Sequence, residues 1–297
     1  MTTLSQHDGA KYLAEEIQKN IPFAAGKLGT SELNAIFFFM AYRRSSAKRP
    51  YPSTIIEHMT VNAGIFPANS DALDSWADYM LKTVLPNMDI VVKWIQSEQE
   101  QIVLRFASPR AIYVPLRSLE PYYENNLTDR WTYNIPDRSI VAVITPFVDT
   151  LQLQWKKRDK IWPGNTVWPS SITLVPIRCF YPSTVATESA PTVWQQAILE
   201  KGWMTAVVSM VTQVKEAKAT IAIVGCGALS LPVVVALKAQ GITAVHTGGA
   251  TQILFGIKGK RWETHATISK LFNESWIGPL KHEVPSGCSK VEGGCYW

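Results

Sequence analysis

The stretch from Thr220 to Glu263 constrains the fold of this chain more than any other. An apolar run from Ile221 to Val224 leads into Gly225-Cys226-Gly227, and an apolar pattern of helical period then continues to Gly241. A second apolar run ends at His246. This order predicts a strand, a glycine turn, a helix and a second strand, and such units join parallel strands through right-handed connections.

Both turns of this unit offer backbone groups to a ligand. The helix that follows Gly225 and Gly227 is expected to direct free N–H groups, and the positive end of its dipole, at the space above the strand. The second strand is followed by small residues that include Gly248 and Gly249, which let a ligand approach the backbone closely. Because ligands of open α/β sheets bind at the carboxyl ends of strands, we expect the two turns to line one anion site.

The N-terminal part of the chain repeats this pattern. The residues from Ile21 to Ile36 again predict a strand, a glycine turn around Gly29 and the beginning of a helix. Thr30 or Ser31 is expected to cap that helix, with Glu32 in its first turn. A carboxylate at this position is explained either by the helix dipole or by a role in a ligand site.

The rest of the chain alternates between strand and helix patterns. The continuous apolar run from Ser139 to Phe147 predicts a central strand covered on both faces, and a short strand is expected over Ile102 to Phe106. Helices are expected over Val148 to Lys160, with Asp149 as dipole partner or catalytic base, and over Thr192 to Lys218. This alternation predicts an α/β fold with a Rossmann-like, doubly wound, mostly parallel sheet and helices on both faces.

Length and composition indicate one enzyme-sized body. A chain of 297 residues with 46% hydrophobic content can bury a large core. We expect a single α/β domain over residues 1–280, in two halves of about 1–135 and 136–280. Prolines and glycines beyond Pro279 predict an irregular C-terminal tail over residues 281–297.

Charge and cysteine usage narrow the class of ligand and the location. The net charge of +5 is spread over scattered Lys and Arg residues, which favours a small phosphate-bearing ligand or an anionic surface over nucleic acid. The N-terminus lacks a signal-peptide pattern and no run approaches the roughly 20 apolar residues of a membrane span, so we expect a cytoplasmic protein. The four cysteines are expected to be free thiols, with a Cys288–Cys295 disulfide as the alternative.

Three blocks of the sequence resemble GT-D-type glycosyltransferases and their uncharacterised relatives from surface-polysaccharide gene clusters. The block Lys27-Leu28-Gly29-Thr30-Ser31-Glu32 is similar to that family's Arg-x-Gly-Asp-Gly-Glu turn. The other blocks are Asn62 to Pro67 and the long run from Gly225 to Trp262. Their order matches that of the family across residues 21–280, so the resemblance covers most of the chain.

The resemblance implies an enzyme that transfers a sugar from a nucleoside-diphosphate donor, with UDP as the first expectation, to a hydroxyl group of a glycan acceptor. The family holds Mn²⁺ or Mg²⁺ beside the donor diphosphate with an Asp, and Thr30 stands at that position here. A hard cation prefers several oxygen ligands. The resemblance therefore implies either a metal held without that Asp, or neutralisation of the diphosphate by Lys27, the 43–49 loop, Lys258 or Arg261.

The chemistry of glycosyl transfer assigns roles to these residues. Negative charge builds on the leaving diphosphate, so cations and backbone donors are expected around it. The expected donor-binding residues are Lys27, Gly29, Thr30, Ser31, Gly225, Gly227, Gly248, Gly249, Gln252, Lys258 and Arg261. An inverting enzyme also needs a base for the acceptor hydroxyl, and the candidates are Glu32, Asp149 and His246. No residue is assigned as a metal ligand, and Gln252 either contacts sugar hydroxyls or caps a helix.

Two other functions stay open. The first is a non-catalytic nucleotide- or sugar-binding protein of the same fold, which Thr30 in place of the family's Asp makes credible. The second is an NAD(P)-dependent oxidoreductase that uses the Gly225-Cys226-Gly227 turn. Its full fingerprint would place Gly or Ala at Ser230 and an acidic residue about twenty positions after the turn, where the chain has the residues from His246 to Ala250.

Overall fold

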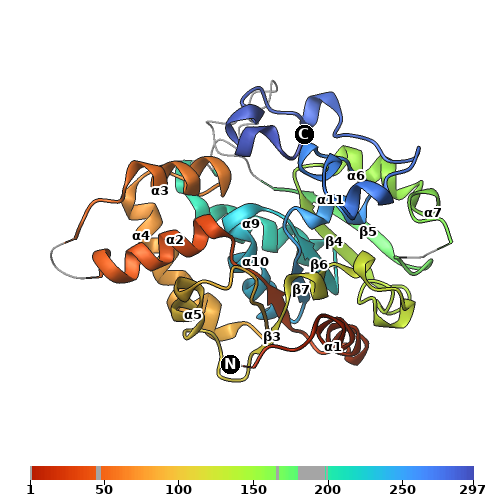
Figure 1. The fold of residues 1–297 in the computed structure, drawn as a ribbon, viewed down its shortest axis with the longest axis horizontal. Helices are drawn as coiled ribbons and strands as arrows, with labels where there is room; N and C mark the ends of the chain where they lie inside the picture. The colour runs from red at the N-terminus through yellow and green to blue at the C-terminus, as the bar shows by residue number, and fades with distance from the viewer. Residues whose placement is uncertain (1, 45–47, 165–166, 180–197, 199) are drawn as a thin grey trace.

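A parallel sheet forms the centre of the molecule in the computed structural model, which describes residues 2–44, 48–164, 167–179, 198 and 200–297 (Figure 1). Over these residues the sheet has seven strands in the order β3-β2-β1-β7-β6-β4-β5, and all neighbouring strands are parallel. The strands are β1 (Ala24–Gly26), β2 (Ile90–Val92), β3 (Ile112–Val114), β4 (Ile140–Thr145), β5 (Thr173–Arg178), β6 (Ile221–Val224) and β7 (Thr243–His246). The predicted α/β class with a parallel, doubly wound sheet is confirmed.

Helices cover both faces of this sheet. They are α1 (Gln6–Lys19), α2 (Thr30–Phe38), α3 (Ser53–Glu57), α4 (Ser70–Tyr79), α5 (Glu98–Leu104), α6 (Val148–Trp155), α7 (Arg158–Ile161), α9 (Trp203–Glu216), α10 (Ser230–Lys238), α11 (Ala250–Leu254) and α12 (Lys260–Glu263). Helices α2, α4, α5, α9 and α10 pack in one core, and α1, α6, α7 and α11 pack in the other. Among the described helices, none combines the length and the apolar character that crossing a lipid bilayer requires.

The strands read as continuous apolar runs because each of their faces is buried. In β4, Ala142 and Ile144 belong to one core, while Val141 and Val143 belong to the other. Successive strand residues point to opposite faces, so both sets must be apolar when helices lie on both sides. The predicted central strand over Ser139 to Phe147 is confirmed in this way.

The unit predicted from the opening stretch is confirmed as β6, α10 and β7. Strands β6 and β7 are adjacent and parallel, with Ile221 opposite Thr243 and Val224 opposite His246. Helix α10 lies between them in the sequence and stops before Gly241, whose φ of 78° is left-handed. Glycine adopts this conformation without steric cost, which explains the end of the helix.

Two local predictions need correction. The strand expected over Ile102 to Phe106 is wrong, because most of this run lies in α5. Ser97 caps that helix by accepting the N–H of Glu100, and the Glu100 carboxylate accepts N–H groups of residues 94–96. A short apolar run does not distinguish a strand from a helix, and the capping residues decide here.

The two helices predicted in the second half are each interrupted in the structure. The helix expected over Val148 to Lys160 is interrupted and forms α6 and α7. The helix expected over Thr192 to Lys218 is helical at residues 198, 200 and 201, breaks at Gly202, whose φ is 88°, and continues as α9, while residues 192–197 and 199 lie outside the described part of the chain.

The two halves of the chain meet in one sheet. Strands β1 to β3 come from residues 1–135 and β4 to β7 from residues 136–280, and the halves join where Ala24 and Ala25 of β1 pair with Ala244 and Val245 of β7. The division into one domain over residues 1–280 and a tail stays a prediction. Residues 281–297 contain only short 3-10 turns in place of longer helices, and the C-terminus lies at the opposite end of the molecule from the N-terminus (Figure 1).

The β1–β7 pair creates the crevice at which the site lies. The chain leaves β1 into α2 on one face of the sheet, whereas it leaves β7 into α11 on the other face. Where connections from adjacent strands diverge, the carboxyl ends of the strands leave an opening that ligands of α/β proteins occupy. The turns that begin at Lys27 and Thr247 therefore lie next to each other.

Substituting Gly227 tests the packing of the second glycine turn. Gly227 has a φ of 59°, and a Cβ there would collide with the carbonyl oxygen of Ala63. Gly241 is the matched control, because its φ of 78° is also left-handed but a Cβ would meet no atom within 4 Å. We expect Gly241→Ala to cost about 1 kcal/mol of unfolding free energy from backbone strain alone, and Gly227→Ala about 3 kcal/mol or more. Equal losses in urea unfolding would show that the turn is not packed as described.

Candidate active site

A cleft of about 390 Å³ lies at the carboxyl ends of β1, β4, β6 and β7. This volume is within the range of roughly 300–1,000 Å³ that small-ligand sites occupy. The predicted residues that line it are Lys27, Gly29, Thr30, Ser31, Glu32, Gly225, Gly227, His246, Gly248, Gly249, Gln252 and Arg261. The turns around Gly29 and Gly227 therefore open into the same cleft.

Two predicted residues do not line this cleft. Asp149 lies in the first turn of α6, where Arg178 is 2.9 Å and His282 is 2.8 Å from its Oδ2 atom. Lys258 places its Nζ atom 5.4 Å from the centroid of the Phe272 ring.

The basic loop over residues 43–49 also stays away from the cleft as far as it is described, with residues 45–47 outside the described part. Arg43 forms a two-pronged ion pair with Asp74 and also donates to the carbonyl of Arg49. Its guanidinium is therefore engaged within the protein.

Lys27 brings an ammonium group into the cleft without a carboxylate partner. It follows β1, is half-buried, and places Nζ 4.6 Å from the centroid of the Trp94 ring. That ring is fixed because its Nε1–H donates to the carbonyl of Leu28 at 2.8 Å. In the described part of the chain, no carboxylate oxygen lies within 4 Å of Lys27 Nζ. Burial lowers the pKa of Lys27, and an anionic ligand would offset that penalty.

The N-terminus of α2 is open toward the same space. Gly29 is the N-cap residue, so the prediction that Thr30 or Ser31 caps the helix is wrong. No protein hydrogen-bond partner of the Thr30 or Ser31 hydroxyl groups or backbone N–H groups occurs among the described residues. These first-turn donors face a cleft that they line.

Glu32 lies beside these donors and serves the helix as well as the cleft. Its carboxyl folds over Gly29, where a Cβ would collide with Oε2, and hydrogen-bonds its own backbone N–H. Both roles left open by the sequence, dipole partner and cleft residue, are thus compatible with its position. Burial is the main cause that raises the pKa of Glu32, and that hydrogen bond and the charge of Lys27 lower it by less.

Most backbone N–H groups of the second glycine turn are already hydrogen-bonded within the protein. The N–H of Gly225 donates to Ile144, that of Cys226 to Ser230 Oγ and that of Ala228 to Ala63, at 2.9, 3.0 and 2.8 Å. The expectation that Gly225 to Ala228 offer their N–H groups to a ligand is therefore wrong for these three residues. The hydroxyl of Ser230, at the beginning of α10, was the sequence signal for this self-capping.

The turn after β7 brings two cations together. Gly248 has a φ of 58°, and a Cβ there would lie 3.4 Å from Lys27 Cε. A Cβ on Gly249 would lie 3.3 Å from Arg261 Nη1. Because neither glycine has a side chain, both cations approach the backbone, and Gly249 N–H has no partner among the described residues. Lys27 and Arg261, the two cations of the described cleft lining, therefore both lie at this turn.

His246 presents a neutral imidazole to this region. The residue is 5% exposed, and its Nδ1–H donates to the carbonyl of Val224 at 2.9 Å. Nε2 is then the unprotonated nitrogen, and it has no protein partner within the described residues. Burial lowers the pKa of His246 to about 4, and the charge of Lys27 adds to this effect.

Sequence reasoning missed the part of the site that the C-terminal residues supply. Glu292, Tyr296 and Trp297 line the cleft. Gln252 Nε2 donates to the carbonyl of Tyr296 at 2.8 Å, and the Trp297 ring packs edge-on against Phe147. Contacts between distant segments leave no local pattern in the sequence. The one sequence signal of burial here is the aromatic pair Tyr296-Trp297 at the end of an otherwise polar tail.

A cluster of possible metal ligands outside the cleft lining is already engaged within the protein. Among the described residues, Asp149, His282 and Glu283 bring potential ligand atoms within 4.8 Å of one another beside the cleft. Arg178 already pairs with both carboxylates, with Nη2 2.9 Å from Asp149 Oδ2 and Nη1 3.5 Å from Glu283 Oε1. The Glu283 carboxylate also accepts the backbone N–H groups of Asp149 and Thr150. Hydrogen bonding to His282 is the main cause that lowers the pKa of Asp149.

Inside the cleft, Mn²⁺ or Mg²⁺ would find few free oxygen ligands. Glu292 is paired with Arg261, so Glu32 is the carboxylate of the described lining that has no ion pair. A hard cation prefers several oxygens. The residues present do not fit a metal held by the protein alone.

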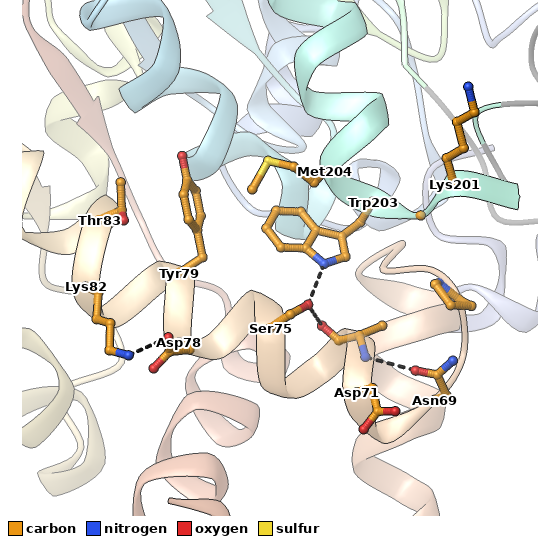
Figure 2. Close-up of a pocket in the computed structure, with 13 residues that line it drawn as sticks. Asn69, Asp71, Ser75, Asp78, Tyr79, Lys82, Thr83, Lys201, Trp203 and Met204 are labelled. Carbon is orange, nitrogen blue, oxygen red and sulfur yellow. Dashed lines mark hydrogen bonds and ion pairs between the residues drawn. The ribbon is translucent and has the colours of Figure 1, made fainter.

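A second hollow of about 630 Å³ lies between α4 and the beginning of α9 (Figure 2). Four of its polar side chains form two pairs, since Trp203 Nε1 donates to Ser75 Oγ at 3.1 Å and Lys82 lies 2.7 Å from Asp78. Lys201 points away from these groups (Figure 2). Among the described residues, the cleft brings two cations and unbonded backbone N–H groups together at the carboxyl ends of strands, so the cleft is the candidate site.

Comparison with known proteins gives only distant likenesses. No protein-family model and no curated protein matches the chain. Two solved structures are similar to it, each with 12% identity over 94% of this chain and 96% of the other. One, with a TM-score of 0.37, is the selenomethionine-substituted structure of domain of unknown function 1792. The other, with a TM-score of 0.36, is a structure of the same domain, described as having a distinct glycosyltransferase fold. Likeness at this level carries no argument about function.

The pH dependence of stability tests the environment of His246. Because its pKa is lowered from 6.5 to about 4, the unfolded chain binds a proton below pH 6.5 that the folded chain does not. The contribution of His246 to the unfolding free energy is therefore largest above pH 6.5 and is lost as the pH falls toward 4. The raised pKa of Glu32 has the opposite effect, because the folded chain then binds the proton more tightly than the unfolded chain does. Relative to His246→Gln, we expect the wild type to lose about 2 kcal/mol of unfolding free energy between pH 7 and pH 5. A constant difference in urea titrations would place His246 in solvent.

Proposed function

We propose that this chain is a glycosyltransferase that moves a sugar from a nucleoside-diphosphate donor, with UDP-sugars as the first choice, to a hydroxyl group of a glycan acceptor. The observation that carries the proposal is that, within the described residues, the Lys27 ammonium has no ion-pair partner and lies beside the open N-terminus of α2 and the unbonded N–H of Gly249. Helix N-termini and buried cations are recurrent phosphate sites. The proposal includes that the enzyme is GT-D-like and acts in the cytoplasm.

The same groups would act in the reaction. When the bond between the anomeric carbon and the diphosphate breaks, the leaving group gains negative charge. Lys27, the N–H groups of Thr30 and Ser31, and Arg261 line the place where that charge would form. Preorganised donors of this kind are worth about 3 kcal/mol each in transition-state stabilisation.

Glu32 is the favoured base in this scheme. It lines the cleft, and its raised pKa matches general-base work near neutral pH better than that of an ordinary carboxylate. His246, with a pKa of about 4, stays neutral and would accept a hydrogen bond from a sugar or acceptor hydroxyl at Nε2. Asp149 and Lys258 are left out of the scheme because they do not line the cleft.

The proposal assigns charge neutralisation to the chain's own cations. Lys27 and Arg261 flank the Gly248–Gly249 turn, and Glu32 lacks the companion carboxylates that a hard cation needs. We therefore expect the nucleoside diphosphate to bind without added Mn²⁺.

The alternatives have weaker support in the site. A dinucleotide would use the Gly225–Gly227 turn, but three N–H groups between Gly225 and Ala228 are already bonded within the protein. A non-catalytic binding protein would share the anion site, and Thr30 in place of the family's Asp favours it. The two functions differ in turnover, because a transferase consumes the nucleoside-diphosphate sugar and a binding protein does not.

Removal of the Lys27 charge tests the anion site. We expect Lys27→Met to weaken binding of UDP by roughly tenfold to a hundredfold, because a hydrogen bond to a charged group contributes about 1.5–3 kcal/mol. Lys258→Met is the matched control, since Lys258 does not line the cleft, and it should bind as the wild type does. Isothermal titration calorimetry measures both. Equal effects of the two substitutions would contradict the assignment.

A second substitution tests the proposed base. Glu32→Gln should keep UDP binding within a few-fold while it lowers the rate of sugar transfer by roughly a hundredfold or more. Thermal unfolding must accompany the assay, because the carboxyl also interacts with the first turn of α2. Unchanged turnover would remove Glu32 from the mechanism.

A further inference from the structure

Arg261 is the second cation of the anion site, and the C-terminal segment holds it. Arg261 Nη2 lies 2.5 Å from Glu292 Oε2, and Nη1 donates to the Tyr296 hydroxyl at 3.2 Å. The guanidinium also lies 4.7 Å from the centroid of the Tyr296 ring. Its backbone N–H donates to the carbonyl of Cys295 at 3.0 Å. These contacts fix the guanidinium over Gly249, where a ligand would meet it.

The two cations of the site thus differ in their availability. Lys27 has no carboxylate within 4 Å among the described residues, whereas the charge of Arg261 is matched by Glu292. A ligand with one phosphate can bind at Lys27 and the N-terminus of α2 without disturbing this pair. A second phosphate that reaches Arg261 must compete with the Glu292 carboxylate.

The backbone at Glu292 indicates that its side chain is needed there. Glu292 has a φ of 47°, in the left-handed region, and is followed by Gly293 and Gly294 at 68° and 78°. Glycine is the favoured residue in such a run, and a non-glycine residue costs about 1 kcal/mol or more. A glutamate persists where glycine would be relaxed. Its N–H lies 3.3 Å from Asn62 Oδ1, which directs the residue toward the cleft.

We propose that Glu292 is a specificity-determining residue that stands in for the second phosphate of the ligand. In the empty cleft it neutralises Arg261, and a nucleoside diphosphate displaces it while a nucleoside monophosphate leaves it in place. Both members of the pair are about one-third exposed, with side-chain exposures of 33% and 38%, so the pair is weak enough to exchange. This inference rests on the proposed function, because it assumes a nucleoside diphosphate in this cleft.

The test compares UDP with UMP by isothermal titration calorimetry on the full chain. For Glu292→Gln we expect roughly two- to fivefold tighter binding of UDP with unchanged binding of UMP, because an exposed ion pair is a modest competitor. The matched control is Glu263→Gln, which removes the same charge from exposed Glu263 on α12, outside the cleft lining. Arg261→Met should lower UDP affinity toward that of UMP.

The outcomes separate this inference from the proposed function. If UDP and UMP bind but Glu292→Gln changes neither, or changes both equally, the stand-in role of Glu292 is overturned and the proposed function survives. If Glu263→Gln has the same effect as Glu292→Gln, the effect is one of net charge and the inference is likewise overturned. If neither nucleotide binds the wild type, the proposed function fails and this inference fails with it.

Discussion

The parallel pairing of β1 with β7 is the constraint on which the site depends. It places Ala25 opposite Val245, so that the turn after Gly26 and the turn after His246 leave the sheet side by side. The chain then runs to opposite faces, and the crevice between α2 and α11 stays open. Lys27 comes from one end of the sequence and Gly248 from the other, and this single pairing makes them neighbours.

This geometry leaves the ammonium group of Lys27 largely desolvated. Lys27 stands between Trp94 and the backbone of Gly248, where burial lowers its pKa by more than the charges of Glu120 and Glu32 raise it, and no carboxylate oxygen of the described residues lies within 4 Å of its Nζ atom. Proteins retain such a group where a ligand supplies the missing charge. The packed turn at Gly227 lines the same cleft with bonded N–H groups, so the unbonded donors of the described lining that we propose for the anion are those of Lys27, α2 and Gly249.

The strand and turn pattern predicted much of this arrangement. Periodicity located β6, α10 and β7, and the rule for the carboxyl ends of strands placed the glycine turns in one cleft. The sequence could not show which N–H groups are free, because the partners of Gly225 and Ala228 lie in distant segments at Ile144 and Ala63. The roles of Glu292 and Tyr296 were hidden for the same reason, since only the folded chain lays residues 292–297 over α11 and α12.

A crystal structure of the chain grown with UDP tests the central claim most directly. The diphosphate should lie between Lys27, the first turn of α2 and the Gly248–Gly249 turn, with its oxygens within hydrogen-bonding distance of Lys27 Nζ. A diphosphate bound on the Gly225–Gly227 turn, or in the hollow between α4 and α9, would contradict the claim.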